Sequence, residues 1–173
     1  TRITDFVDAA PTSTKEELGL PESWHHFSEL LEQSKNTIPP RVPIVNSDPA
    51  IIQFTGGTTG IPKGAVLTHK NVVAASFQCD MWGFSVIGRL PVSRKRVLCT
   101  LPFFHVYGEI VALCTSVKNG STMVILPRFD PDEVVNTIAA FPEFSFWPVV
   151  PTMLAAVLNH PRAQELNLAK RFA

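Results

Sequence analysis

Residues 50–67 of the chain read AIIQFTGGTTGIPKGAVL. Two apolar runs, 50–54 and 64–67, enclose a loop rich in glycine and threonine, and each run has the length of a short strand. Residues 54–64 hold four glycines, three threonines and one lysine. Glycines let backbone amides approach an anion closely, and hydroxyls and a lysine add further donors. The pattern therefore predicts a strand–loop–strand unit that binds a polyphosphate.

The loop differs from the P-loop of GTPases and Walker-type ATPases. That motif needs a lysine directly after glycine, followed by Ser or Thr and a helix. Here Pro62 precedes Lys63, and Gly64 follows it. The difference disfavours a simple GTPase or ATPase. A glycine-rich connection that binds no ligand is the structural alternative.

Predicted strands and helices alternate through the rest of the chain. Aliphatic and β-branched runs predict three further strands, at residues 96–101, 122–126 and 144–150. Apolar periodicity and start signals predict helices at residues 28–33, 69–81, 102–117, 131–141 and 152–158. Thr68 and Asp130 are expected to cap the helices that follow them. The alternation predicts an α/β fold, a mostly parallel sheet flanked by helices.

Composition sets the domain organisation and excludes several classes of protein. Residues 1–45 are polar and broken by prolines, and are expected to form an arm and linker, with one domain over 46–173. Fifteen basic and fifteen acidic residues give zero net charge, which argues against a nucleic-acid binder. No apolar run approaches the ~20 residues that a membrane span needs. A cytoplasmic protein, with peripheral membrane contact as an option, is expected.

Two smaller features favour structural interpretations. Three widely spaced cysteines suit neither a disulfide framework nor a zinc site, and are expected to be reduced, buried small hydrophobes. The basic run Arg94-Lys95-Arg96 is interpreted as a solvated loop before a strand.

Three segments carry a family resemblance. Residues 55–64, followed by Val66, Thr68 and His69, resemble the phosphate-loop signature of the adenylate-forming (AMP-binding) superfamily. Residues 101–108 (LPFFHVYG) resemble its aromatic–histidine segment beside the acyl pocket, and 126–130 (LPRFD) resemble its next strand-to-helix corner. The resemblance favours the branch of acyl-CoA synthetases that ligate long-chain fatty acids. It implies that residues 46–173 are a fragment of the N-terminal domain of such an enzyme.

The resemblance implies a reaction in two steps. ATP activates a carboxylic acid, expected to be a fatty acid, as an acyl-adenylate, and coenzyme A then displaces AMP. Negative charge on the phosphates is stabilised by amides, hydroxyls, a lysine and Mg²⁺. ATP, Mg²⁺ and coenzyme A are therefore the expected cofactors and co-substrates, and the acid is the expected small-molecule partner.

The resemblance also implies roles for single residues. His105 is expected to act in catalysis and to contact the acid together with Tyr107, while Arg128 meets phosphates of coenzyme A and Thr58 lies nearest the metal. The expected phosphate-binding residues are Thr55, Gly56, Gly57, Thr58, Thr59, Gly60, Pro62, Lys63 and Gly64. The structural alternatives are packed core positions for His105 and Tyr107 and a solvated surface position for Arg128.

Two other family elements do not occur in the sequence. It contains no Tyr-Gly-x-Thr-Glu segment, the usual source of a metal-binding Glu, and no Gly-Asp pair for the ribose. The isolated chain is therefore expected to be inactive and to self-associate through faces left uncovered. Two alternative functions stay open: a non-catalytic nucleotide-binding module, and an adenylation domain of a peptide synthetase.

Overall fold

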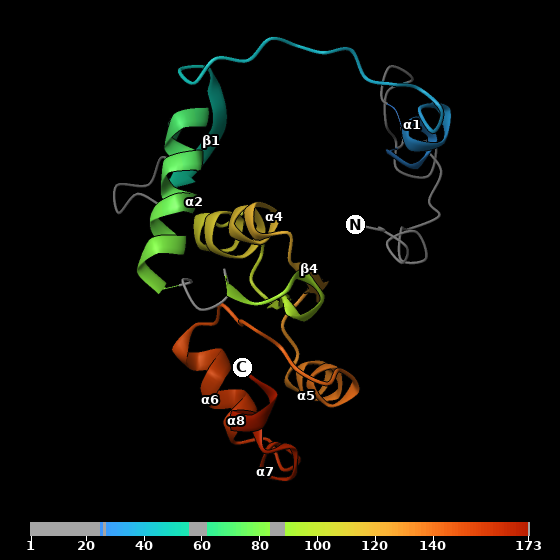
Figure 1. Cartoon of the computed structure of the whole chain (residues 1–173), viewed down its shortest axis with the longest axis vertical. Coiled ribbons are helices and arrows are strands. Elements are labelled where there is room, and N and C mark those ends of the chain that lie inside the picture. Colours follow the sequence, from blue (N-terminus) through green and yellow to red (C-terminus); the bar gives the residue numbers. More distant parts are fainter. Residues whose placement is uncertain (1–24, 26, 56–61, 84–88, 173) are drawn as a thin grey trace. The chain divides into compact units, whose positions relative to one another are not determined.

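The computed structural model describes residues 25, 27–55, 62–83 and 89–172. The chain divides into two compact units, residues 1–43 and 44–173, and each is described by itself. In the first unit, α1 (Phe27–Gln33) is the predicted short helix (Figure 1). An acidic residue lies in its first turn, where the helix dipole favours negative charge.

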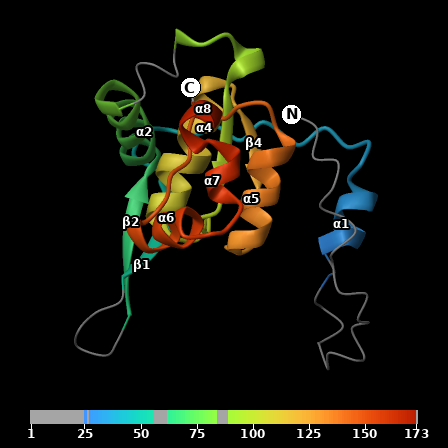
Figure 2. The ribbon, with the colours of Figure 1, turned by 90° about the horizontal axis from the view of Figure 1, so that it is seen from below.

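The second unit begins with a β-hairpin (Figure 2). β1 (Pro49–Thr55) pairs antiparallel with β2 (Lys63–Thr68), and Ile52 lies opposite Val66. Both strands lie where the sequence predicts them, but they do not join the mostly parallel sheet that was expected. Residues 56–62 are too few for the crossover of about a dozen residues that parallel pairing needs, so the chain returns as a hairpin.

α2 (His69–Gly83) follows β2 directly. Its cap is reciprocal: the Asn71 N–H donates to Thr68 Oγ1 at 3.3 Å, and the Thr68 N–H donates to Asn71 Oδ1 at 2.9 Å. The predicted Thr68 cap is therefore confirmed, with Asn71 in the place that Glu or Gln takes in a capping box. α2 packs against both strands of the hairpin, which fixes the base of the hairpin in the unit.

The central strands are parallel, as the sequence predicts. β3 (Arg96–Cys99) pairs with β4 (Thr122–Ile125). Two consecutive helices connect them: η2 (Tyr107–Cys114), a π-helix, and α4 (Thr115–Asn119). A strand, a helical crossover and a parallel strand form the β-α-β unit typical of α/β folds.

The connecting helix begins later than predicted. Apolar residues suggested a helix from Pro102, but residues 102–105 form a turn in which the His105 N–H donates to the Pro102 carbonyl at 3.1 Å. At the far end, Gly120 closes α4 with a φ of 63°, a left-handed conformation that favours glycine.

Residues 144–150 are not the continuous strand that the sequence predicts. They form two isolated parallel bridges, Val97 with Phe146 and Phe144 with Phe172. The Phe146 carbonyl accepts a hydrogen bond from the Leu98 N–H at 3.0 Å, so the segment lies alongside β3. Pro148 lacks an N–H and interrupts further pairing.

Four helices complete the second unit: α5 (Pro131–Ala140), α6 (Pro151–Leu158), α7 (Ala163–Leu166) and α8 (Leu168–Arg171). Asp130 caps α5 as predicted, since its Oδ1 accepts the Glu133 N–H at 3.1 Å. The main core forms where α5 and α6 meet β3 and residues 144–147. Its buried residues are Leu98, Val134, Val135, Ile138, Phe144, Trp147 and Val157.

The basic run Arg94-Lys95-Arg96 is not the solvated loop that was expected. Arg94 forms a bidentate ion pair with Glu143, at 2.7 and 2.9 Å. Lys95 is only 8% exposed and donates to a backbone carbonyl, and the Arg96 guanidinium lies 5.1 Å from the centre of the Phe141 ring. The run therefore ties η1 (Val92–Arg94) and β3 to the segment after α5.

The cysteines are free thiols; Cys99 is buried as expected, whereas Cys79 and Cys114 are only half-buried. Burial raises the pKa of the Cys99 thiol in β3 to about 12. Burial, with a smaller contribution from Glu109, also raises the pKa of Cys114. Both thiols therefore stay protonated at neutral pH and pack as small apolar groups. Within the described ranges, no helix combines the length and apolar character needed to cross a bilayer.

Candidate functional site

The predicted phosphate loop connects the two strands of the hairpin. Thr55 and Lys63 are the last paired residues of the register, so they stand at the two ends of the loop. Pro62 and Lys63 are exposed there. The other predicted phosphate-binding residues lie outside the described residues: Gly56, Gly57, Thr58, Thr59 and Gly60.

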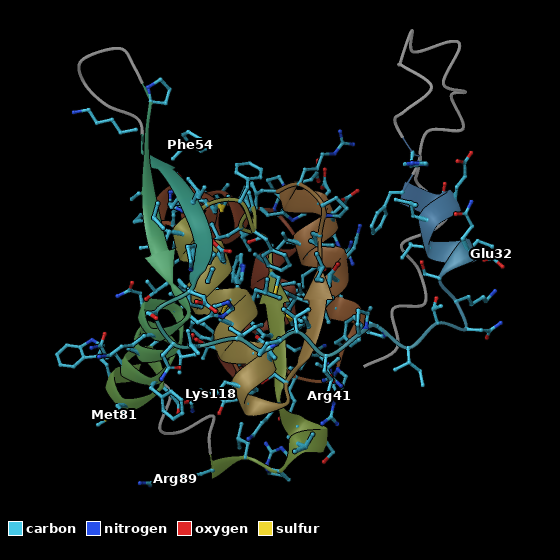
Figure 3. The ribbon with its side chains drawn as sticks, turned by 90° about the horizontal axis from the view of Figure 1, so that it is seen from above. Glu32, Arg41, Phe54, Met81, Arg89 and Lys118 are labelled. Carbon is cyan, nitrogen blue, oxygen red and sulfur yellow. The ribbon has the colours of Figure 1, made fainter. Side chains whose placement is uncertain are left out.

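Gly64 makes room for two side chains of β1. A Cβ atom at residue 64 would lie 2.8 Å from Ile52 Cγ2 and 3.6 Å from the Phe54 ring. Real Cβ contacts are not that short, so any other residue would displace the β-branched Ile52. Glycine at the start of β2 thus keeps Phe54 and Ile52 close to the second strand, next to the loop (Figure 3).

A second part of the site is the His105 turn, residues 102–106, which follows β3. The Tyr107 N–H donates to His105 Nδ1 at 3.2 Å, and the Glu109 N–H donates to the His105 carbonyl at 2.9 Å. In the neutral ring this leaves the proton on Nε2, a donor for a carboxylate or phosphate oxygen. His105 is exposed and Tyr107 half-buried, so His105 is not the packed core residue of the structural alternative.

Gly108 lets the first turn of η2 close onto the His105 turn. A Cβ at this residue would lie 2.3 Å from the Pro102 carbonyl oxygen and 3.3 Å from Leu101 Cβ. The backbone of the helix therefore approaches the backbone of the turn more closely than any side chain allows. π-Helical turns of this kind occur often at functional sites.

Gln53 connects the hairpin with the His105 turn. Its Nε2 donates to the Phe104 carbonyl at 3.3 Å, between residues 51 positions apart in the sequence. β1, which leads to the loop, and the His105 turn are thus neighbours in space. Sequence reasoning missed Gln53, because one polar residue in an apolar strand has no local signal that separates it from a surface residue.

Arg128 follows β4, as the His105 turn follows β3. β3 and β4 are neighbours, and the Leu126 N–H still donates to the Cys99 carbonyl at 3.0 Å, so the segments after both strands leave from one edge. Ligands commonly bind at this edge of α/β sheets. Arg128 is exposed and makes no hydrogen bond or ion pair with the described residues.

The described residues supply donors rather than metal ligands. Among residues 25, 27–55, 62–83 and 89–172, no group of three or more His, Cys, Asp or Glu side chains could hold a metal ion. Thr58, the expected metal contact, lies outside these ranges. What the described arrangement offers is an ammonium group at Lys63 and an imidazole at His105, both suited to anionic oxygens.

The sequence resembles known enzymes over most of its length. The AMP-binding enzyme family matches residues 2–172. A long-chain-fatty-acid–CoA ligase from Bacillus subtilis is 38% identical over 148 residues, which is 84% of this chain and 25% of that protein. The 4-coumarate–CoA ligase 1 of Petroselinum crispum is 31% identical over 154 residues, 86% of this chain and 27% of that protein. The chain thus spans about a quarter of the length of these relatives.

Solved structures show the same fold. The inhibitor-bound N-terminal domain of FACL13 from Mycobacterium tuberculosis matches with a TM-score of 0.68 and 29% identity, over 83% of this chain and 34% of that chain. ATP-bound MatB from Rhodopseudomonas palustris matches with a TM-score of 0.56 and 30% identity, over 68% of this chain and 22% of that chain.

Proposed function

Because the chain belongs to the AMP-binding enzyme family, we propose that it forms the triphosphate-binding part of an acid–CoA ligase. Such a ligase uses ATP to convert a carboxylic acid to an acyl-adenylate and then transfers the acyl group to coenzyme A. Membership of the family confirms the resemblance seen in the loop and in the aromatic–histidine segment. The reaction of the whole protein is the proposal.

The observation that best supports this function is the contact between the hairpin and the His105 turn. Adenylate formation brings a carboxylate to the α-phosphate of ATP, so phosphate donors and an acid-binding group must be adjacent. The Gln53 hydrogen bond joins β1, which leads to the loop, with the backbone beside His105. A phosphate loop that lay far from His105 would not serve this reaction.

The proposed roles follow from the chemistry of the side chains. Lys63 and the amides and hydroxyls of Thr55–Gly60 bind the β- and γ-phosphates, where charge builds up in the transition state. His105 donates from Nε2 to an oxygen of the acid or of the α-phosphate, and Tyr107 orients the imidazole through its backbone N–H. Arg128 binds a phosphate of coenzyme A. Mg²⁺ neutralises phosphate charge in this kind of reaction, and Thr58 is the residue proposed to lie beside it.

For the acid, we propose a long-chain fatty acid. The 38% identity to a ligase named for that substrate supports this choice over the 31% identity to a 4-coumarate ligase. An aromatic acid is the second candidate, on the strength of those plant relatives. The test is acid-dependent exchange of pyrophosphate into ATP by the full-length ligase. Palmitate should support exchange and 4-coumarate should not. The reverse would assign the aromatic acid.

The phosphate role is tested on the 173-residue chain itself by equilibrium binding of a non-hydrolysable ATP analogue. Lys63→Met and Thr58→Val should each weaken binding by about tenfold or more, as expected for the loss of a donor to charged phosphate. Lys70→Met removes the same charge from the exposed first turn of α2 and is the control. This variant should bind the analogue normally. Unchanged binding in both loop variants would remove the phosphate role. Pyrophosphate exchange by the chain alone should stay at background.

A further inference from the structure

Gln53 lies on the less exposed face of β1. Its neighbours Ile52 and Phe54 are both strongly exposed, at 60% and 65%, whereas Gln53 is half-buried. Side chains alternate between the faces of a strand, so Gln53 lies on the face opposite to these two residues. Across the hairpin it pairs with Ala65, whose methyl group offers the Gln53 amide no hydrogen-bond partner.

The amide of Gln53 reaches the His105 turn. Nε2 donates to the Phe104 carbonyl at 3.3 Å, and lies at the longer distance of 3.5 Å from the carbonyl of its own neighbour Phe54. A hydrogen bond to the Phe104 carbonyl acts on the residue that immediately precedes His105. It therefore restrains the backbone from which the imidazole projects.

The side chains of the turn supply little that would hold it against the hairpin. Phe104 is 84% exposed, and His105 is exposed as well, so neither is anchored by burial. Phe103 is half-buried, but it packs against the cluster of Val97, Cys99 and Ala112 in β3 and η2, not against the hairpin. The bonds from His105 to Pro102 and from Tyr107 to His105 keep the internal shape of the turn. Neither of these two bonds reaches β1. The Gln53 hydrogen bond does, and it therefore restrains the distance between the turn and β1.

We propose that Gln53 is a positioning residue, which fixes the place of His105 relative to the end of β1. Gln53 lies two residues before Thr55, where the loop begins, and its bond partner lies one residue before His105. The Gln53 amide thus connects the end of β1 directly with the His105 turn. The importance of this spacing rests on the proposed function, whereas the restraint on the turn does not.

The restraint is tested by amide hydrogen exchange on the 173-residue chain, followed by NMR. Gln53→Met keeps the length of the side chain and removes the donor. The amides of His105 and Tyr107 should then exchange about fivefold to tenfold faster, as expected for the loss of one neutral hydrogen bond. Amides in β3 and β4 should not change. Ile52→Val, next to Gln53 but on the opposite face, is the matched control and should leave the turn protected.

Equal exchange rates at His105 and Tyr107 in Gln53→Met and in the unsubstituted chain would overturn the proposal. If Gln53→Met does not fold, Gln53→Glu replaces it. An ionised carboxylate cannot donate and would face the Phe104 carbonyl, so it should accelerate exchange at least as much.

A second measurement asks whether the restraint couples His105 to the loop. A non-hydrolysable ATP analogue is titrated while the ring signals of His105 are followed with labelled histidine. Its affinity should change less than about twofold in Gln53→Met, because the loop donors remain, but the His105 response should fall by about half or more. An undiminished response would contradict the positioning role. If the unsubstituted chain binds no analogue, the proposed function fails, while the exchange rates still decide whether Gln53 holds the turn.

Discussion

Two glycines in this chain are required for different physical reasons. Gly108 is required for space, because a side chain there would meet the Pro102 carbonyl oxygen at 2.3 Å. Gly120 has open space around it, but its φ of 63° disfavours most side chains. The first glycine shapes the His105 turn, and the second only ends α4. Single substitutions should therefore separate a glycine needed by the candidate site from one needed by a helix end.

Gly108→Ala should lower the free energy of unfolding by about 1–3 kcal/mol, since the new methyl group must push two backbone segments apart. Urea denaturation followed by circular dichroism measures this. Gly120→Asn is the control: Asn tolerates the left-handed conformation, so its cost should stay below about 1 kcal/mol. A Gly108→Ala chain as stable as the control would contradict the close approach of η2 to the turn.

At the scale of elements, one carboxylate of α2 joins that helix to α4. Asp80 accepts hydrogen bonds from Lys118 Nζ at 2.6 Å and from Asn119 Nδ2 at 3.0 Å. The Lys118 ammonium also lies 4.6 Å from the centre of the Phe77 ring. The hydrogen bond from Lys118, more than any other contact, holds the pKa of Asp80 below its ordinary value. The helix that supports the hairpin is thus joined to the β3–β4 crossover by a charged group.

This pair predicts a loss of stability in acid. A lowered pKa means that the folded state favours the charged carboxylate, so the stabilisation is present above the unfolded pKa of 3.8 and is lost as pH falls below it. Between pH 4 and 2, the free energy of unfolding should fall more steeply in the unsubstituted chain than in Asp80→Asn. For one group the difference cannot exceed ~1.4 kcal/mol per pH unit.

Urea titrations at several pH values provide the measurement for Asp80. Glu29→Gln removes an exposed carboxylate from α1 and serves as the control, which should keep the steep acid loss. Identical slopes for the unsubstituted chain and Asp80→Asn would show that Lys118 does not hold this carboxylate in its charged form.

At the scale of the whole molecule, the second unit exposes several large apolar side chains, and exposed apolar patches favour association. Ile52, Phe54 and Val66 lie on one face of the hairpin and are 57–65% exposed. Met81 and Trp82, at the end of α2, are 80% and 94% exposed. Among the residues that the structure describes, both strands of the hairpin also have an unpaired edge. With zero net charge, there is little electrostatic repulsion between copies.

We therefore expect the 173-residue chain to self-associate, with sedimentation velocity showing dimers or larger species whose share rises with concentration. Replacing Ile52 and Val66 together by Thr keeps two β-branched residues in the strands and should weaken association by about tenfold. Ile38→Thr removes an even more exposed apolar residue from the first unit and should change little. A monomer at all concentrations would contradict this expectation.

Local patterns in the sequence were sufficient to predict several features of this protein. The hairpin strands, the Thr68 and Asp130 caps and the family of the loop depend on residues within a few positions of each other. Such short-range rules operate whatever surrounds them. The parallel pairing of β3 with β4 was predictable as well, because two strands joined by a helical segment usually pair in parallel.

Packing between distant segments settled the remaining features. The Gln53 bond to Phe104 and the burial of Lys95 join groups that lie far apart in the sequence. The space required at Gly108 and the start of η2 depend on how the backbone of residues 102–106 folds back. The periodicity of the sequence does not predict such contacts, because they form only when the elements pack together. The family was therefore predictable from the sequence, whereas the placement of His105 beside the hairpin required the folded chain.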